Sequence, residues 1–270
     1  MLGLYAKAAV GAVLPGRGTS LPTVQLERSV TPTVAQLADY AEVCGFGLGD
    51  TLPIPFPHVL GFPLQIELMA GRSFPLALPG LVHIANTITV HRPIGLGERL
   101  DIRVRAERFA AHARGAQVDL VTEIDVDGTR VWDGRSTYLA RGAQAPTGVA
   151  GILPEPEAPE GPASAVWRVP GDIGRRYAAV SGDVNPIHLN PVTAKAFGFP
   201  RTIAHGMWTA ARALASLQGR TPDTATYTVL FRKPLVIPST VELVTEPGWT
   251  LAVRDRKGSA HLVGAITPSR

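Results

Sequence analysis

Cysteine is almost absent from this 270-residue sequence, in which Cys44 is the only one. One cysteine cannot form an intramolecular disulfide and cannot build a metal site from several thiolates. His83 and His91 share one face of a predicted strand, but no third ligand accompanies them. We therefore expect no metal and a reducing compartment, the cytoplasm in particular.

Long apolar runs are also missing. Outside the first 16 residues, no stretch approaches the ~20 apolar residues that a membrane-spanning helix needs. The N-terminal segment MLGLYAKAAVGAVLPG is apolar but too short to span, and its single Lys7 makes a poor signal sequence. We predict that it forms a short helix packed on the protein, ending at Pro15 and Gly16, and we expect no membrane span.

Strong charge of one sign is lacking as well, because 26 Lys and Arg face 22 Asp and Glu, for a net charge of +4. No basic run, zinc-finger spacing or basic stretch with interleaved aromatics occurs, which argues against a nucleic-acid partner. A mild positive field suits a phosphorylated ligand or an acidic carrier protein. An ordinary basic surface is the simpler explanation.

Proline and glycine, by contrast, are plentiful, with 24 and 28 residues, and they concentrate in one segment. Residues 142–164 read GAQAPTGVAGILPEPEAPEGPAS, which offers little to bury and is typical of a semi-extended linker. The sequence therefore predicts two units, residues 1–141 and residues 165–270, on either side of this linker.

Both predicted units have the same order of elements, a helical section followed by a series of strands. The first has a helix over 34–43, a second apolar helix, and strands near 81–92, 99–108, 115–126 and 130–140. The second has a strand over 165–169, a helix from Ile173 with Asp172 as N-cap, a short helix with Asn190 as N-cap, and a helix from about 206 to 217. Strands over 226–232, 240–245, 249–254 and 261–266 complete it. This repetition indicates a duplicated α+β unit.

A weak direct repeat supports the duplication. The pattern from Tyr40 to Gly45 recurs from Tyr177 to Gly182, 137 residues later. At the same shift, Phe46, Leu48 and Thr51 stand where the second half has Asp183, Asn185 and His188. We therefore expect chemistry only in the second half, with the first half shaping a cavity.

The segment SGDVNPIH, residues 181–188, carries the densest group of reactive side chains. Asp183, Asn185 and His188 lie within six residues between two predicted helices, and Gly182 and Pro186 restrict the path of the loop. A carboxylate and an imidazole that converge on one pocket can perform paired proton transfer. The plain alternative is a structural loop in which Asp183 caps the chain and His188 is a core histidine.

A second informative stretch is IAHGM, residues 203–207. Gly206 is predicted to be the first residue of an apolar helix, where backbone N–H groups are free and the helix dipole is positive. Such an N–H can stabilise a developing oxyanion. The neighbouring His205 is a candidate for ligand contact, although packing or capping explains it better.

The residues from 177 to 207, YAAVSGDVNPIHLNPVTAKAFGFPRTIAHGM, resemble the hydratase 2 motif of MaoC-like dehydratases and (R)-specific enoyl-CoA hydratases. The linker and a first half without the motif are similar to the double-hotdog members, above all the mycobacterial-type (3R)-hydroxyacyl-thioester dehydratases. The resemblance implies a double hotdog fold, in which two long central helices are each wrapped by a curved antiparallel sheet.

The resemblance also implies residue roles. Asp183 and His188 would hold a water molecule and act as the acid/base pair, with Asn185 orienting the water or His188. The Gly206 amide would bind the thioester carbonyl oxygen. Further candidates for substrate binding are Ser181, Gly182, Pro186, His205, Phe56 and Phe62.

The implied activity is reversible hydration of trans-2-enoyl thioesters to (3R)-3-hydroxyacyl thioesters in fatty acid metabolism, with no cofactor. Substrates would be acyl-CoA or acyl-carrier-protein thioesters, the carrier protein would be a partner, and the protein would be a monomer or a homodimer of double hotdogs. Two alternatives stay open: a hotdog acyl-thioester hydrolase, and a non-catalytic acyl-thioester-binding subunit.

Overall fold

The computed structural model describes residues 18–146 and 149–269. The predicted N-terminal helix therefore lies outside the described residues. The first half contains β1 (Leu26–Val30), α2 (Val34–Cys44), α3 (Phe56–Ala70), β2 (Leu81–Val90), β3 (Leu100–His112), β4 (Gly115–Val126) and β5 (Thr129–Arg141). The second half contains β6 (Ala165–Val169), α4 (Ile173–Ser181), α5 (Pro186–Leu189), α6 (Pro191–Ala196), α7 (Gly206–Ala215), β7 (Ala225–Phe231), β8 (Ser239–Glu246), β9 (Thr250–Arg254) and β10 (Ala260–Pro268).

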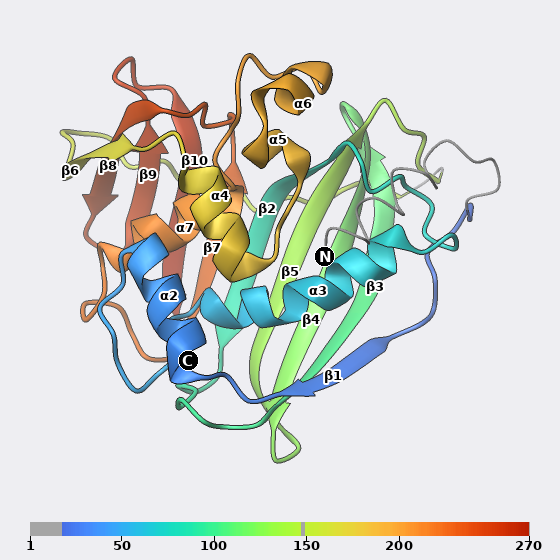
Figure 1. Cartoon of the computed structure of the whole chain (residues 1–270), viewed down its shortest axis with the longest axis horizontal. Coiled ribbons are helices and arrows are strands. Elements are labelled where there is room, and N and C mark those ends of the chain that lie inside the picture. Colours follow the sequence, from blue (N-terminus) through green and yellow to red (C-terminus); the bar gives the residue numbers. More distant parts are fainter. Residues whose placement is uncertain (1–17, 147–148, 270) are drawn as a thin grey trace.

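All the strands belong to one antiparallel sheet, in the order β1-β3-β4-β5-β2-β7-β10-β9-β8-β6. Read inward from its own edge, the second half repeats the order of the first, because β6, β8, β9, β10 and β7 take the places of β1, β3, β4, β5 and β2. The halves meet where β2 pairs with β7, around Thr87 and Thr228. Helices cover one face of the curved sheet, with α3 crossing the strands of the first half (Figure 1). The α+β double hotdog architecture is confirmed.

The sequence repeat corresponds to a structural repeat. Helices α2 and α4 each end at a glycine in the left-handed region, Gly45 with φ 81° and Gly182 with φ 71°, where a residue with a side chain would be strained. The two helices pack against each other, and the rings of Tyr40 and Tyr177 lie 6.4 Å apart, both buried. The same residue pattern has thus produced the same helix end twice.

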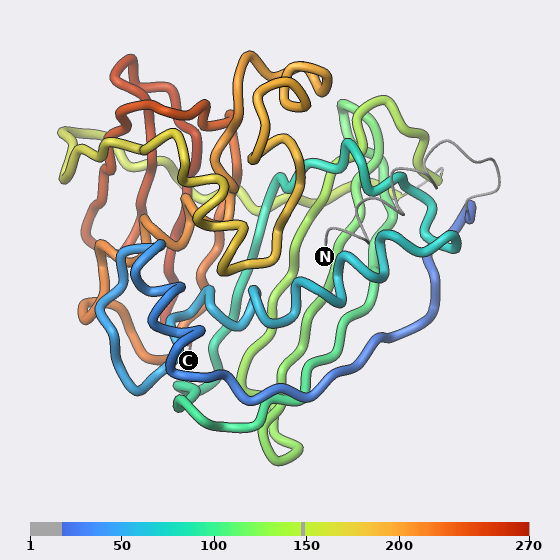
Figure 2. Tube along the Cα trace, in the orientation of Figure 1, coloured from blue at the N-terminus to red at the C-terminus, as the bar shows by residue number. Residues whose placement is uncertain are grey.

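The segment between the halves runs from the end of β5 to β6 at the opposite edge of the sheet (Figure 2). Where it is described, it forms backbone hydrogen bonds at both ends, from Gly142 N to Arg114 O at 2.9 Å and from Ser164 N to Leu243 O at 2.7 Å. This long crossing lets the second half begin at its own outer edge, as the first half does.

Three details differ from the sequence-based expectation. Strand β1 was not expected, because LERSV is polar and largely exposed along the edge of the sheet. Residues 186–189 form the single-turn helix α5 within the predicted loop. Asp172 stands at the N-cap of α4, but its side chain makes no capping hydrogen bond, whereas Asn190 caps α6 as predicted.

The apolar core is continuous across both halves. Its largest cluster includes Leu37 and Trp132 from the first half and Trp208 and Val241 from the second. A smaller cluster beneath α5 and α6 contains Ile187, Ala194, Phe199 and Ile203. Among the described helices, none has the length and apolar character needed to cross a membrane.

Candidate functional site

The site begins where α4 ends. The Ser181 hydroxyl donates to Tyr177 O at 2.7 Å and accepts from Asp183 N at 3.1 Å, and Gly182 turns the chain through the left-handed region. Together these contacts stop the helix and place Asp183 at the start of the following loop. Its side chain is 23% exposed.

Two short-range contacts fix the shape of this loop. Asp183 Oδ1 accepts from Asn185 N at 3.2 Å, and Asn185 Oδ1 accepts from Ile187 N at 3.3 Å. Asn185 is therefore the N-cap of α5, with Pro186 at the first helical position, where no N–H is needed. Because its Oδ1 is engaged, the amide N–H groups are what Asn185 can offer to the cavity that it lines.

His188 lies on α5 with its protonation pattern set by the backbone. Its Nδ1 is 2.8 Å from the carbonyl oxygen of Ile203. Since a carbonyl only accepts, the neutral ring carries its proton on Nδ1 and has a lone pair on Nε2. Burial lowers the pKa of His188 below its usual value, although the charge of Asp183 acts in the opposite direction. The imidazole is therefore a neutral base at physiological pH.

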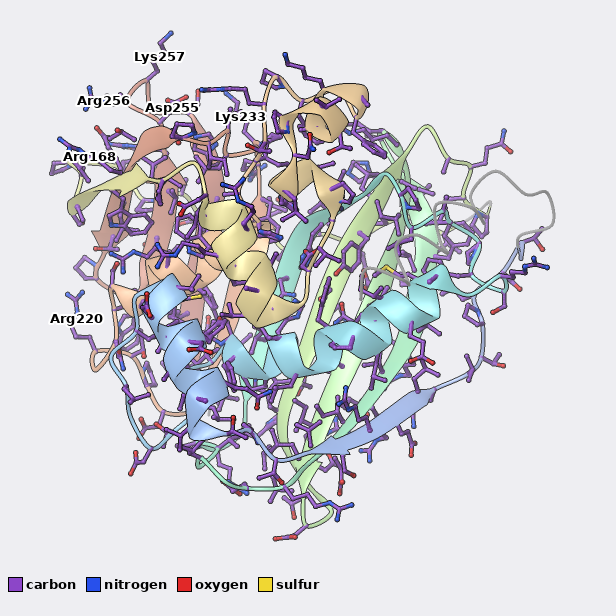
Figure 3. All side chains as sticks on the ribbon, in the orientation of Figure 1. Arg168, Arg220, Lys233, Asp255, Arg256 and Lys257 are labelled. Atoms are coloured by element: carbon purple, nitrogen blue, oxygen red, sulfur yellow. The ribbon has the colours of Figure 1, made fainter. Side chains whose placement is uncertain are left out.

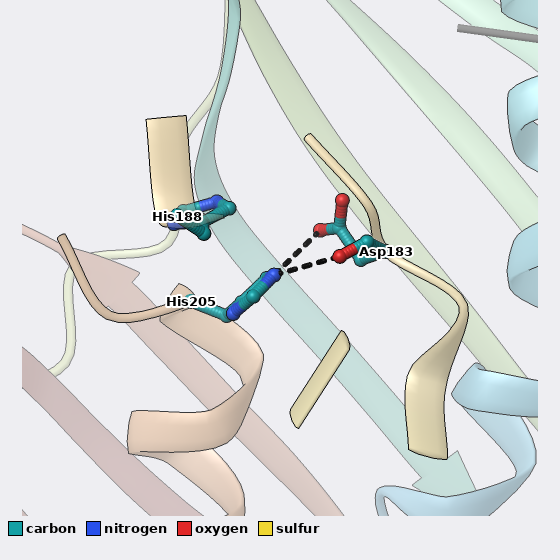
Figure 4. A group of neighbouring side chains, drawn as sticks. All are labelled: Asp183, His188 and His205. Atoms are coloured by element: carbon teal, nitrogen blue, oxygen red, sulfur yellow. Dashed lines mark hydrogen bonds and ion pairs between the residues drawn. The ribbon is translucent and has the colours of Figure 1, made fainter. Parts of the chain in front are cut away.

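His205 contacts both Asp183 and His188. Its Nε2 lies 3.0 Å from Asp183 O and 3.8 Å from Asp183 Oδ2, and its ring stacks on that of His188 with centroids 3.7 Å apart (Figure 4). The side chain is 2% exposed, and burial lowers the pKa of His205 to about 3. A neutral His205 thus donates to the Asp183 backbone and fixes the distance between the carboxylate loop and α7.

Gly206 is the first residue of α7, so its N–H has no acceptor within the helix. A Cβ at this position would lie 2.9 Å from the nearest atom of the Phe231 ring, which is tighter than normal contacts allow. The close approach of this ring therefore favours glycine at position 206. Because Gly206 also lines the cavity, a carbonyl oxygen bound there can reach the positive end of the helix.

One cavity connects these groups and draws on both halves of the chain. Of the candidate residues, Asp183, Asn185, His188, Ser181, His205, Gly206 and Phe62 line it. Gly182 and Pro186 shape the loop without lining the cavity, and Phe56 packs in the core against Tyr40 instead, with ring centroids 5.0 Å apart. The first half adds an apolar side formed by Val59, Phe62, Ile66, Met69, Leu78 and Leu81.

Among the lining residues of the first half that sequence reasoning missed are three with polar rings: His58, His83 and Tyr138. They belong to α3, β2 and β5, and only the sheet pairing and the position of α3 bring them to the cavity. The local signal for His58 is its place in a largely apolar helix.

Asp183, His188 and His205 are also a candidate metal group, because one potential ligand atom from each lies within 4.8 Å of the others. However, one nitrogen of each imidazole already faces a backbone carbonyl, and His205 is almost fully buried. The expectation that the protein uses no metal stays a prediction.

Comparison with known proteins gives consistent matches. A family model described as "MaoC like domain" matches residues 164–261. The chain is 41% identical over 269 residues to 3-hydroxyacyl-thioester dehydratase X of Mycobacterium tuberculosis (strain ATCC 25618 / H37Rv), covering 96% of this chain and 95% of the relative.

Solved structures match in the same way. A crystal structure of HtdX from Mycobacterium tuberculosis aligns with a TM-score of 0.82 at 38% identity, covering 91% of this chain and 100% of that one. A MaoC-like dehydratase from Phytophthora capsici aligns with a TM-score of 0.74 at 18% identity, covering 96% and 98% of the two chains. The second match shows the fold alone.

Proposed function

Because this chain belongs to the MaoC-like dehydratase family, we propose that it is a hydro-lyase that interconverts trans-2-enoyl thioesters and (3R)-3-hydroxyacyl thioesters in fatty acid metabolism. One observation carries the assignment of the site. A carboxylate, a neutral imidazole with a free Nε2 and a glycine N–H at a helix start all line the same cavity.

In the hydration direction, a water molecule is held between the Asp183 carboxylate and His188 Nε2. As the water oxygen bonds to C3 of the enoyl thioester, Asp183 and His188 together accept one proton from the water. They then deliver this proton to C2. The neutral state of His188 suits it to accept a proton, and the nearby carboxylate stabilises the imidazolium that forms. Positioned groups of this kind contribute typically about 10²–10⁴-fold in rate.

Negative charge develops on the carbonyl oxygen of the thioester while the water oxygen bonds to C3. The Gly206 N–H, at the positive end of α7, donates to that oxygen. A single donor of this kind contributes roughly 3–4 kcal/mol to transition-state stability. The role of Asn185 is to hold α5, and hence His188, in position through its capping hydrogen bond.

The test is the absorbance of the conjugated enoyl thioester. On addition of the protein to a trans-2-enoyl-CoA, the absorbance should decay to an equilibrium, and the product should be the (3R)-hydroxyacyl-CoA when the enantiomers are resolved. A thiol reagent in parallel detects hydrolysis. Release of thiol without hydroxyacyl product, or ligand binding without turnover, would refute the proposal.

The carrier of the acyl group is part of the proposal. Arg114, Arg141, Arg232 and Lys233 line the cavity, and Lys233 lies at the same end of the molecule as α5 and α6 (Figure 3). Cationic side chains that line the cavity suit the phosphates of coenzyme A or of a carrier-protein arm. Action in the cytoplasm, as a monomer or a homodimer of double hotdogs, completes the proposal.

A further inference from the structure

The first half contributes a polar patch to a cavity wall that is otherwise apolar. The rings of His58, His83 and Tyr138 form a stack, with 6.1 Å between the centroids of His58 and His83 and 4.6 Å between those of His83 and Tyr138. The interplanar angles are 26° and 23°. All three residues line the cavity that contains Asp183.

Two of the three rings, those of His83 and Tyr138, contact polar side chains outside the cavity. The Tyr138 hydroxyl donates to Gln65 Oε1 at 3.1 Å, and His83 Nε2 is 3.4 Å from Asn86 Nδ2. Gln65 and Asn86 are themselves buried and both contact Ser136 Oγ, at 3.4 and 2.9 Å. This network fixes the orientation of His83 and Tyr138 before any ligand binds.

His58 differs from its neighbours. It is 4% exposed, yet within residues 18–146 and 149–269 no group forms a hydrogen bond with its ring. Its nitrogens are not among the polar atoms sealed inside the protein without a partner, so the cavity is the space that they face. Burial lowers the pKa of His58 to about 4, so the ring is neutral and offers one donor and one acceptor. An imidazole that faces a cavity and bonds to no protein group has its donor and acceptor available to a ligand in that cavity.

The position of His58 indicates which part of a ligand it meets. His58, Phe62, Ile66 and Met69 follow helical spacing on α3, and all line the cavity. His58 is at the start of this face. Its ring lies 6.1 Å from that of His83, which lies 5.1 Å from the ring of Phe231, the residue next to Gly206. An acyl chain leaving the reactive carbons therefore passes His58 before it reaches the apolar side chains.

We infer that His58 is a specificity-determining residue that forms a hydrogen bond with an oxygen substituent on the acyl chain, a few carbons beyond C3. This inference rests on the proposed function. A hydroxyl or keto oxygen at that point provides the partner that the imidazole lacks, whereas an unsubstituted chain leaves the imidazole unpaired. The protein prefers the oxygenated substrate because an unsubstituted chain leaves the His58 imidazole without a hydrogen-bond partner. Other sites that bind a substrate hydroxyl discriminate in the same way.

The experiment compares kcat/KM for trans-2-enoyl-CoA substrates of equal length, one unsubstituted and others with a hydroxyl on successive carbons from C5. The wild-type protein should prefer one hydroxylated substrate by about ten-fold or more, the value of one net hydrogen bond. His58→Leu should remove this preference and should raise or maintain kcat/KM for the unsubstituted chain. Phe62→Leu, one turn further along the same face, should change kcat/KM for both substrates alike.

His58→Gln keeps a hydrogen-bonding group and should retain part of the preference, which decides the matter if the leucine variant fails to fold. The inference is overturned if the wild-type protein shows no preference at any position, or if folded His58→Leu keeps the wild-type ratio. Hydration of either substrate by the wild-type protein supports the proposed function independently. Absence of hydration with every substrate contradicts the proposed function itself.

Discussion

The two halves of the molecule have the same strand order and the same helix end, but they diverge directly after it. After Gly182 the chain forms α5 and α6 and brings Asp183 and His188 to the cavity. After Gly45 the half-buried Phe46 ring stacks on Tyr40 with centroids 6.2 Å apart, and residues 47–50 are exposed. A duplicated scaffold can thus assign chemistry to one copy and the shape of the cavity to the other.

The first-half loop is also tied down by the second half. Gly47 N donates to Gln218 Oε1 at 2.6 Å, and Gln218 Nε2 donates to Gly47 O at 3.2 Å. The loop has exchanged reactive side chains for contacts that hold the halves together. Substitutions at matched positions of the two halves test this difference.

The largest effect is expected at the acid/base pair. Asp183→Asn and His188→Ala should each lower kcat by about 10²–10⁴-fold, because each removes a positioned proton-transfer group. The assay is the decay of enoyl-thioester absorbance, with circular dichroism to confirm folding. Thr51→Ala, at the position that matches His188 by sequence shift, should retain wild-type kcat. Equal losses at Thr51 and His188 would contradict the division of labour.

The next effect concerns the start of α7. Gly206→Ala places a methyl group 2.9 Å from the Phe231 ring, so either the ring or the helix start must shift, and a shift of the helix start carries the N–H with it. We expect kcat/KM to fall by about 10–100-fold, since misplacement of a donor by a fraction of an ångström is costly. Phe231→Leu in the same chain should restore much of the lost activity. Full activity in the single variant would show that this glycine is not required.

A smaller effect is expected in the pH dependence of stability. The folded-state pKa of His58 is about 4, below its value of about 6.5 in an unfolded chain, and that of His83 is lowered to about 3 beside it. The unfolded chain therefore binds more protons as the pH falls from about 6.5 to 4, and the free energy of unfolding decreases over that window. Tm measured from pH 8 to pH 4 should fall less steeply for His58→Leu than for the wild-type protein. Phe62→Leu should keep the wild-type slope, and parallel curves for all three would refute the assignment.

The smallest expected effect concerns the N-terminal caps of the two equivalent helices, α2 and α4. Thr33 caps α2 in a capping box with Gln36, at 3.2 Å from Thr33 Oγ1 to Gln36 N, whereas Asp172 at the start of α4 makes no capping hydrogen bond. Thr33→Ala should cost about 1 kcal/mol of stability in urea denaturation, and Asp172→Ala close to none. A larger loss at Asp172 than at Thr33 would contradict the difference between the caps.

Local residue order was enough to predict most of the second-half site. Gly182 ends α4 and Asn190 caps α6, because glycine and asparagine act on their immediate neighbours. The contact of His205 with the Asp183 backbone joins residues 22 apart and was not predictable from either alone. Strand β1 has too few buried positions for a periodic signal, whereas its counterpart β6 buries Trp167 and was predicted.

The cavity-lining residues of the first half show more clearly what the sequence could not predict. Phe56 and Phe62 are both apolar residues of α3, and sequence could not tell that only Phe62 reaches the cavity. That distinction depends on how α3 rotates against the sheet. His83 meets Tyr138 through the pairing of β2 with β5, and His58 meets His83 only because α3 packs against the sheet. The residues that sequence analysis missed therefore line the cavity because of long-range packing.

The seam between the halves has a consequence for any attempt to work with the motif-bearing half alone. Along it, β7 is covered by β2 over six residue pairs, from Ala85 with Leu230 to Val90 with Ala225. Expressed by itself, that half would leave this row of backbone groups bare, and a bare edge recruits another strand. Such a fragment would keep the reactive loop but lose the ring stack that lines the same cavity in the intact chain.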